Sequence, residues 1–263
     1  MKESVTPRDY TVPSVDRAAR ILTYLKHRHA GVTEIADALE ITRSNCYAIL
    51  KTLQAYTLLA FNPDDKSYSL GLGLLELGGA ISKDFAVIGV VRPFLIQHVR
   101  ESNLTTFVVW RFGERRLILL DKEESPGDVR ISIAVGTRLP ITHGASGKCF
   151  LAFLAADERE RLIETVGIPK TTTHTITDPV RYRAEIVRIQ RDGYVTSAEE
   201  SAIGTNALAA PVFDSDGKIL LVLTAIGFTA SLPPQSMRTL GRALRDTGDR
   251  ITRALGGTPP KWR

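Results

Sequence analysis

The clearest pattern in the chain is a pair of apolar periodicities within residues 33–59. In both halves the apolar side chains recur at the three-to-four-residue spacing that places them on one face of a helix. The halves are separated by a break at residues 40–42, which we interpret as a tight turn. Two short helices joined by such a turn form a helix-turn-helix. The inward positions are Ile35, Ala36 and Leu39 in the first half and Cys46, Ile49, Leu50 and Leu53 in the second.

The opposite face of the second helix is polar. With the apolar positions turned inward, Arg43, Ser44, Tyr47 and Lys51 point outward. A recognition helix presents its N-terminal side chains to the major groove, while longer cations farther along reach the phosphate backbone. The alternative is an ordinary surface helix whose polar face is merely solvated. This stretch alone does not separate the two interpretations.

The segment before this pair favours the DNA-binding interpretation. Residues 14–26 repeat the helical pattern and predict a supporting helix with Ser14 as its N-cap. Thr33 and Thr42 stand where the next two N-caps are expected, because a hydroxyl there can accept a hydrogen bond from a first-turn amide. The expected inward face of the supporting helix consists of Val15, Ala18, Ala19, Leu22 and Leu25.

The segment after the pair predicts a hairpin. Two short apolar and aromatic runs flank residues 62–65, Asn-Pro-Asp-Asp, which carry strong turn signals. A hairpin behind a helix-turn-helix is a wing, and Lys66 near its tip is placed to reach a phosphate. A purely structural hairpin that closes a small core is compatible with this interpretation. We expect the domain to span residues 14–70.

Residues 71–86 continue with leucines at near-helical spacing, but they include glycines at positions 71, 73, 78 and 79. Each glycine inside a helix costs about 1 kcal/mol relative to alanine. The segment therefore needs packing against something else. We expect a linker helix that also pairs with a second subunit.

Residues 87–257 predict an α+β domain in which an antiparallel sheet is faced by helices. Alternating patterns indicate strands near both ends, and helical periodicity dominates the middle and the termini. The expected helices are 87–103, 144–154, 157–166, 179–191 and 234–255, and the expected strands are 105–112, 115–122, 130–135, 194–197, 207–214 and 218–227.

Composition agrees with a globular, cytoplasmic protein. No apolar run approaches the roughly 20 residues of a membrane span, and residues 1–13 read as a flexible leader rather than a secretory signal. The net charge of +5 permits nucleic-acid binding without proving it. Cys46 and Cys149 are too few for a disulfide framework or a four-ligand metal site, and both lie in apolar helical patterns. Residues 258–263 are expected to form a tail.

Enzyme interpretations fit the sequence poorly. The stretch THGASGKC lacks the residues that a phosphate-binding loop or a nucleophile elbow needs. His143, Cys149 and His174 could be imagined as a nucleophile with bases, but a thiol in an apolar stripe is a poor site for a thiolate. The adjacent pair Glu199 and Glu200 reads as a solvated strand end rather than an acid/base dyad. No histidines show metal-ligand spacing, and no cofactor is expected.

Four stretches in this order resemble the isocitrate lyase regulator (IclR) family of bacterial transcription factors, over almost the whole chain. The helix-turn-helix with its wing and linker resembles the family's DNA-binding part, and the two longer blocks resemble its GAF-like effector-binding domain. The resemblance implies operator binding as a homodimer or a homotetramer, under the control of a small metabolite. The stretches are SVDRAARIL, EIADALEITRSNCYAILKTL with YSLGLGLLELG, GTRLPITHGASGKCFLAFL and DGYVTSAEESAIGTNALAAPVFDSDGKILLVLTAIG.

Two departures from the family pattern matter. Its recognition helix usually starts Lys-Ser-Thr with an arginine four positions after the serine, whereas this chain has Ala48 in that position. The operator contacts must therefore be distributed differently. We expect them from Arg17, Arg43, Ser44, Asn45, Tyr47, Lys51 and Lys66. In the second departure, the late strand that usually reads Ser-x-Ser-Gly carries Thr224 and Ile226 instead, which removes one hydroxyl and adds an apolar side chain.

The resemblance also implies an effector site between the sheet and its loops. Free amides at the start of the helix near residue 144, together with a serine hydroxyl, favour a carboxylate or another anion. The alternative is a helix start that Ser146 caps without any ligand. We expect a small organic acid with a sizeable apolar body, aromatic or branched. The expected contacts are Ile131, Leu139, Ala145, Ser146, Gly147, Ser197, Ala207, Thr224 and Ile226.

The sequence thus predicts a ligand-responsive, DNA-binding transcriptional regulator, with a repressor favoured over an activator. Its expected partners are double-stranded operator DNA, a small organic acid and a second copy of itself. The competing class is a stand-alone sensor or enzyme whose N-terminal helices serve only in dimerisation.

Overall fold

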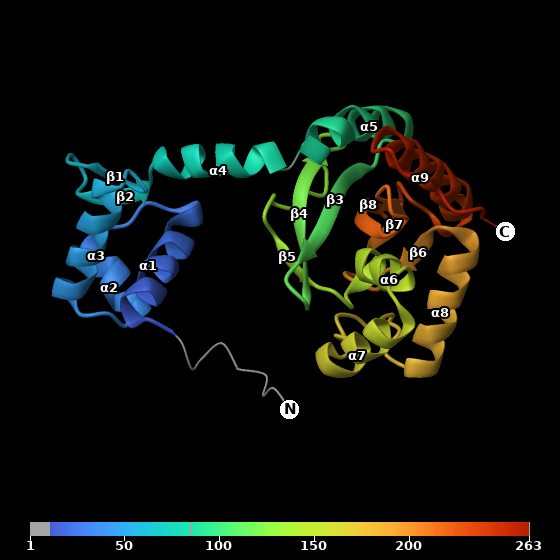
Figure 1. Ribbon diagram of the computed structural model, residues 1–263, viewed down its shortest axis with the longest axis horizontal. Helices are drawn as coiled ribbons and strands as arrows, with labels where there is room; N and C mark the ends of the chain where they lie inside the picture. Colours follow the sequence, from blue (N-terminus) through green and yellow to red (C-terminus); the bar gives the residue numbers. More distant parts are fainter. Residues whose placement is uncertain (1–10, 85, 263) are drawn as a thin grey trace. The chain divides into compact units, whose positions relative to one another are not determined.

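The computed structural model describes residues 11–84 and 86–262. The chain divides into two compact units, one within residues 1–85 and one within residues 86–263. Most of the leader expected at residues 1–13 lies outside the described residues. Figure 1 labels the helices and strands of both units.

Up to residue 70, the described part of the N-terminal unit consists of three helices, a short 3₁₀ turn and a hairpin. Its core is formed by the apolar positions that the periodicity predicts, including Ile35, Cys46 and Leu50, each at most 1 % exposed. Since these side chains come from both halves of the 33–59 pattern, the helix-turn-helix is confirmed. The elements are α1 (Pro13–Tyr24), η2 (Leu25–His27), α2 (Val32–Leu39), α3 (Arg43–Ala55), β1 (Leu59–Asn62) and β2 (Ser67–Leu70).

The helix starts differ from the expected caps. Helix α1 begins at Pro13, one residue before Ser14, because proline has the right φ for a first helical position and no amide to satisfy. Helix α2 begins at Val32 after the extended Gly31, so Thr33 lies inside its first turn. Thr42 does precede α3 as its N-cap residue, but its hydroxyl accepts no hydrogen bond from the described first-turn amides.

The inward face of α1 also differs from the expectation. Val15 is 65 % exposed and Ala19 is exposed, whereas Ile21 is fully buried. The apolar stripe therefore runs through Ile21 of α1 and Leu25 of η2, with Ala18 and Leu22 packed against the same core as expected. Val15 stands at the solvent-facing start of α1.

The wing is held to the helices by a third short pairing. Strands β1 and β2 are antiparallel, with Asn62 opposite Ser67 at the loop. Ala30, in the connection before α2, exchanges two backbone hydrogen bonds with Tyr68 of β2, at 3.2 and 2.9 Å. This bridge fixes the hairpin against the helix-turn-helix.

The segment after the wing forms helix α4 (Gly73–Asp84), and its first glycines have a packing role. The amide of Gly71 donates to the carbonyl of Leu58 and that of Gly73 donates to the carbonyl of Thr57, both at 2.9 Å. A side chain at position 71 or 73 would collide with Thr57. The glycines therefore let the start of the linker lie directly on the end of the helix-turn-helix.

The C-terminal unit is an antiparallel six-stranded sheet in the order β5-β4-β3-β8-β7-β6, faced by helices, so the α+β fold is confirmed. The strand expected at residues 130–135 is wrong, because that segment is irregular and the sheet edge is formed by residues 138–140 instead. The elements are α5 (Ala86–Ser102), β3 (Thr105–Phe112), β4 (Arg116–Glu123), β5 (Arg138–Pro140), α6 (Gly144–Ala152), α7 (Ala156–Val166), α8 (Pro179–Asp192), β6 (Val195–Ala198), β7 (Thr205–Phe213), β8 (Ile219–Phe228) and α9 (Pro234–Ala254).

Helices cover both faces of this sheet. Helices α5 and α9 contact each other and pack on one face, and α6 packs on β6, β7 and β8 from the other side (Figure 1). The main core lies on the α6 side and includes Phe107, Cys149, Ile186 and Val222. Because successive residues of a strand face opposite sides, each strand contributes to both layers.

Candidate nucleic-acid interface and ligand site

The outward face of α3 is exposed as the pattern predicts. Arg43, Ser44, Tyr47 and Lys51 are exposed, and Asn45 is partly exposed. Below them Cys46, Ile49, Leu50 and Leu53 are buried, which fixes the rotation of the helix about its axis. Side chains from the first three turns of α3 therefore form one continuous polar surface.

Lys51 is placed between α3 and the wing. Its Nζ lies 5.7 Å from the ring centroid of Tyr47 and 5.6 Å from that of Phe61 on β1, within the range of cation–π attraction. It also donates a hydrogen bond of 3.2 Å to Oε1 of Gln54. These contacts position the ammonium group at the surface without neutralising its charge.

The remaining cations of the expected interface are less favourably placed. Lys66 is exposed at the end of the wing loop, in a left-handed conformation with φ of 55°. Next to it, the Asp65 carboxylate accepts hydrogen bonds from Ser67, which lower the pKa of Asp65 and keep it charged beside the lysine. Arg17 on α1 is partly exposed. The structure thus gives α3 a stronger positive surface than the wing.

In the C-terminal unit, strand pairing brings three of the nine expected effector contacts into one row. Ser197 lies opposite Ala207, which lies opposite Ile226, which lies opposite Thr105. Residues paired across antiparallel strands project from the same face. The adjacent row contains Thr224 and belongs to the core on the α6 side. These rows therefore face the start of α6.

The start of α6 meets the sheet at this point. Oγ of Ser146 lies 2.9 Å from Oγ1 of Thr224, within hydrogen-bond distance. Ser146, Ser197 and Thr224 are 5 %, 2 % and 2 % exposed, so the hydroxyls of this face are buried in an otherwise apolar layer. No described side chain caps the first turn of α6. Hydroxyl donors and a helix N-terminus in one place suit an anion.

Of two further expected effector contacts, Ile131 lies beside the row and Leu139 lies far from it. The carbonyl of Ile131 accepts a hydrogen bond of 2.9 Å from Thr105, which holds the irregular segment beside the row. Leu139 on β5 pairs with Leu117, which in turn pairs with Arg111 of β3. Arg111 lies about 20 Å along the strand from Thr105 at the usual rise per residue. Leu139 is therefore the most remote of the expected contacts.

Close packing of α6 explains why position 147 is a glycine. A Cβ at this position would lie 2.7 Å from the carbonyl oxygen of Ile141 and 2.8 Å from the carbonyl carbon of Thr142. Ala145 is likewise buried in the core. Both residues allow α6 to approach the preceding loop closely, whether or not a ligand binds.

Family models match both units of the chain. The model for the IclR helix-turn-helix domain covers residues 14–63, and that for the bacterial transcriptional regulator IclR C-terminal domain covers residues 80–253. The chain belongs to the IclR family of transcriptional regulators. It is therefore a DNA-binding regulator with a C-terminal effector domain, and not an enzyme.

Individual relatives agree with the family. The HTH-type transcriptional repressor AllR of Salmonella typhi is 27 % identical over 249 residues, which cover 94 % of this chain and 91 % of that protein. The crystal structure of an IclR transcriptional regulator from Alicyclobacillus acidocaldarius is 31 % identical, with a TM-score of 0.79, covering 94 % of this chain and all of that one. An IclR homologue from Microbacterium hydrocarbonoxydans, complexed with 4-hydroxybenzoate, shares the fold with a TM-score of 0.81 and 20 % identity, covering 92 % of this chain and 98 % of that one.

One polar element of this IclR-family chain is missed by sequence reasoning. Lys148 on α6 is 1 % exposed, and its Nζ lies 2.5 Å from Oε1 of Glu200. The expectation that Glu200 forms a solvated strand end is wrong. Strand β6 ends at Ala198, and Glu199 adopts a left-handed conformation, so the alternation of a strand no longer applies and Glu200 turns toward α6. The available signal was Lys148 itself, a charge within an apolar stripe that needs a buried partner.

The remaining reactive residues of the regulator are not arranged for catalysis. Complete burial raises the pKa of the Cys149 thiol, which disfavours a thiolate. Burial lowers the pKa of His143, and His174 is an exposed side chain 4.0 Å from Glu199. Among the described residues, no group of three or more His, Cys, Asp or Glu side chains could hold a metal ion. No helix in residues 11–84 or 86–262 is long and apolar enough to cross a membrane.

Proposed function

We propose that this IclR-family regulator is a repressor that binds operator DNA through α3 and releases it when a small organic acid occupies the C-terminal domain. In this arrangement residues 14–70 bind DNA, residues 71–86 link, and residues 87–257 sense the effector. The observation that carries the proposal is the exposed face of α3, because it combines two cations with polar side chains at the N-terminal turns of a supported helix. The naming of AllR as a repressor supports the direction of control.

We assign the operator contacts unequally. Arg43, Ser44 and Asn45 occupy the first turn of α3, where a recognition helix reads base edges. Tyr47 and Lys51 lie one and two turns later, where they reach phosphates. Lys66 and Arg17 add weaker backbone contacts. Ala48 is exposed in the middle of this face and offers no donor, so Lys51 takes over the role of a cation there.

We propose that the effector is an organic acid with an apolar body, aromatic or branched. Its carboxylate would meet the first turn of α6 with the hydroxyls of Ser146, Thr224 and Ser197. Its apolar part would lie against Ile226, Ala207 and Ile131, which are all partly exposed and leave that end of the row accessible. The Microbacterium homologue binds 4-hydroxybenzoate, an acid of this class.

We also propose that the linker pairs with a second copy of the chain. Leu72, Leu75 and Leu77 are 81 %, 73 % and 56 % exposed, which is unusual for leucines along one short segment. Covering them in a dimer would also place two α3 helices on one operator. Two half-sites supply affinity that a single recognition helix lacks.

The DNA-binding proposal is tested by substitutions on α3. Arg43→Ala and Lys51→Ala should each weaken binding to DNA flanking the coding region by roughly 5- to 150-fold, as expected for about 1–3 kcal/mol per contact. Arg100→Ala, which removes an exposed cation from α5, should leave the affinity unchanged. Fluorescence anisotropy measures all three. Unaltered binding in both α3 variants would show that α3 is not the reading helix.

The effector proposal is tested by thermal shift with 4-hydroxybenzoate and with glyoxylate, a two-carbon oxoacid. The wild-type chain should be stabilised by the aromatic acid and not by glyoxylate. Ile226→Ser should reverse part of this preference, because it replaces apolar surface with a hydroxyl. Stabilisation of the wild type by glyoxylate alone would contradict the proposed class of ligand.

A further inference from the structure

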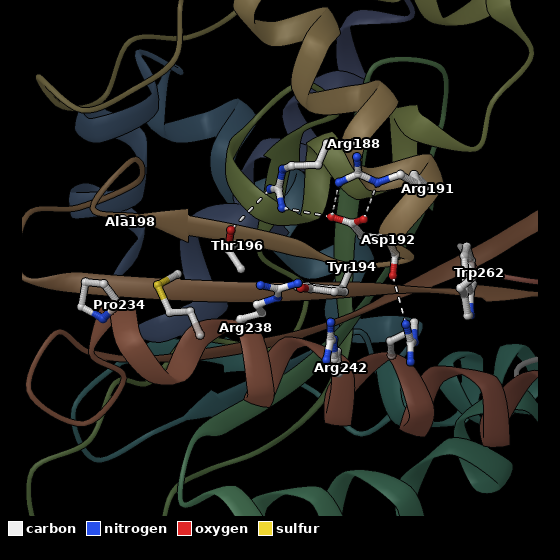
Figure 2. A pocket seen from close by; sticks show the side chains of 12 residues that line it. Arg188, Arg191, Asp192, Tyr194, Thr196, Ala198, Pro234, Arg238, Arg242 and Trp262 are labelled. Carbon is white, nitrogen blue, oxygen red and sulfur yellow. Dashed lines mark hydrogen bonds and ion pairs between the residues drawn. The ribbon is translucent and has the colours of Figure 1, made fainter.

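A large basic groove lies at the edge of the sheet, away from the effector row. It has a volume of about 1090 Å³ and opens between the end of α8 and the first half of α9, with β6 as its floor (Figure 2). Its lining consists of Arg188, Arg191, Asp192, Tyr194, Thr196, Ala198, Pro234, Met237, Arg238, Arg242, Arg245 and Trp262.

The groove and the effector row are on opposite faces of β6. Thr196 and Ala198 line the groove, whereas Val195 and Ser197 belong to the face that packs toward α6. Alternation along a strand sends neighbouring side chains to opposite faces. A ligand in the groove would therefore be a second ligand, held by different residues.

Charge in the groove is strongly unbalanced. Five arginines and a single carboxylate line it. Guanidinium nitrogens of Arg188 and Arg191 lie 3.8 and 2.7 Å from carboxylate oxygens of Asp192. The hydrogen bond from Arg191 is the largest cause of a lowered pKa of Asp192, and the charges of Arg191, Arg188 and Arg238 lower this pKa further. Asp192 is thus held ionised, and it forms its ion pairs with the arginines of α8.

The α9 arginines are the available cations. Arg238 and Arg242 are exposed and one helical turn apart, so both project from the same side of α9. Within residues 11–84 and 86–262, neither has a hydrogen-bond partner or an ion-pair partner within 4 Å. Arg245, the next along this face, pairs with Asp246 at 2.9 Å and donates to the carbonyl of Asp192. Thr196 adds a hydroxyl to the floor, 3.4 Å from Arg188.

The far wall of the groove is rigid and aromatic. Trp262 donates to the Asp249 carboxylate at 3.0 Å and packs against Phe153 and Phe213. Gly193 gives it room, since a Cβ there would lie 2.5 Å from the indole. The groove is therefore preformed on this side, with a flat apolar surface facing the arginines.

We propose that this groove binds a small organic phosphate carrying at least two negative charges. Guanidinium groups bind phosphate oxygens in a bidentate manner and remain charged at every physiological pH. A monocarboxylate would leave most of the positive charge unpaired, whereas a multiply charged phosphate matches the two free arginines of α9 and the hydroxyl of Thr196. The volume suits a compact metabolite with room for an organic part beside Trp262.

The test is isothermal titration of the full-length chain without DNA, with pyrophosphate and fructose 1,6-bisphosphate as probes at about 0.15 M ionic strength. Both probes should bind. Arg238→Gln/Arg242→Gln should weaken them at least tenfold. The matched double variant Arg161→Gln/Arg181→Gln, which removes two exposed helix cations elsewhere in the unit, should bind as the wild type does. Ile226→Ser should also leave phosphate binding unchanged.

Four results would overturn the proposal. The first is no binding of either probe, and the second is equal loss in both double variants. The third is tighter binding of citrate than of the phosphates, which would assign the groove to carboxylates. The fourth is a change in oligomeric state or in operator affinity caused by Arg238→Gln/Arg242→Gln without phosphate binding by the wild type, which would make the groove a protein or DNA contact.

Discussion

Lys148→Met tests how the buried ion pair supports the start of α6. The side chains of Lys148 and Glu200 are 1 % and 8 % exposed, so neither charge is solvated. Among the residues that the structure describes, removal of the lysine leaves the carboxylate with only a long hydrogen bond of 3.4 Å from the amide of Ile176. Breaking a buried pair in this way costs about 3–5 kcal/mol. We expect the free energy of unfolding of the C-terminal unit to fall by that amount.

The loss should extend to the loops around the pair. The Glu200 carbonyl accepts hydrogen bonds from the hydroxyls of Thr171 and Thr175, at 2.6 and 2.8 Å. The ion pair therefore ties two loops to α6, next to the proposed effector site. We expect Lys148→Met to weaken effector binding as well as to lower stability.

Urea unfolding followed by tryptophan fluorescence measures the change, because Trp110 and Trp262 both lie in the C-terminal unit. The matched control is Arg183→Met, which breaks the exposed pair with Glu160 and should cost at most about 1 kcal/mol. Lys148→Met/Glu200→Met should recover much of the loss, since apolar replacements of a buried pair are often tolerated. A cost for Lys148→Met no larger than that of Arg183→Met would refute the reasoning.

Three further predictions concern the C-terminal unit. Gly147→Ala should cost about 1–3 kcal/mol in urea unfolding through its collision with the backbone of residues 141 and 142, whereas Gly89→Ala on open helix surface should be neutral or stabilising by up to about 1 kcal/mol. Burial lowers the pKa of His98, although the nearby Glu101 acts in the opposite direction, so the imidazole takes up a proton at higher pH in the unfolded state than in the folded state. The free energy of unfolding should therefore fall as the pH drops below about 6.5. His98→Gln should make this pH dependence weaker in thermal unfolding measured at a series of pH values. The Cys149 thiol should react with a disulfide reagent only at the rate of unfolding, and rapid labelling of the folded chain would contradict its burial.

Much of the fold follows from local patterns because the periodicity reports the buried face directly. Helical spacing alone predicts all four buried residues of α3, Cys46, Ile49, Leu50 and Leu53. The caps were less predictable. A serine or threonine near the start of a helix is compatible with an N-cap at several neighbouring positions. Pro13 and Gly31 determine where α1 and α2 begin.

Long-range pairing explains the larger errors. Residues 130–135 alternate like a strand, but β4 pairs with residues 138–140 instead. The Ser132 hydroxyl donates a hydrogen bond to Glu124 and accepts one from Lys122, which holds this segment in its irregular conformation. Nothing local distinguishes these two outcomes.

The functional sites likewise divide into features that follow from local sequence and features that depend on long-range contacts. The polar stripe of α3 is a local feature and was visible in the sequence. The pair of Lys148 with Glu200 joins residues 52 positions apart, and the arginine groove is assembled from α8, β6 and α9. In the sequence its arginines lie on two separate expected helices, 179–191 and 234–255. Only the sheet order places them around one volume.

The salt dependence of operator binding tests the central claim most directly. The affinity of the full-length chain for DNA flanking its coding region should fall steeply with salt, by about 0.9 logarithmic units per decade for each phosphate contact. Lys51→Ala should make the slope shallower by about one contact, and Ala48→Arg should make it steeper by about one, because position 48 is exposed between Ser44 and Lys51. A salt-independent affinity, or slopes that neither substitution changes, would contradict DNA recognition through α3.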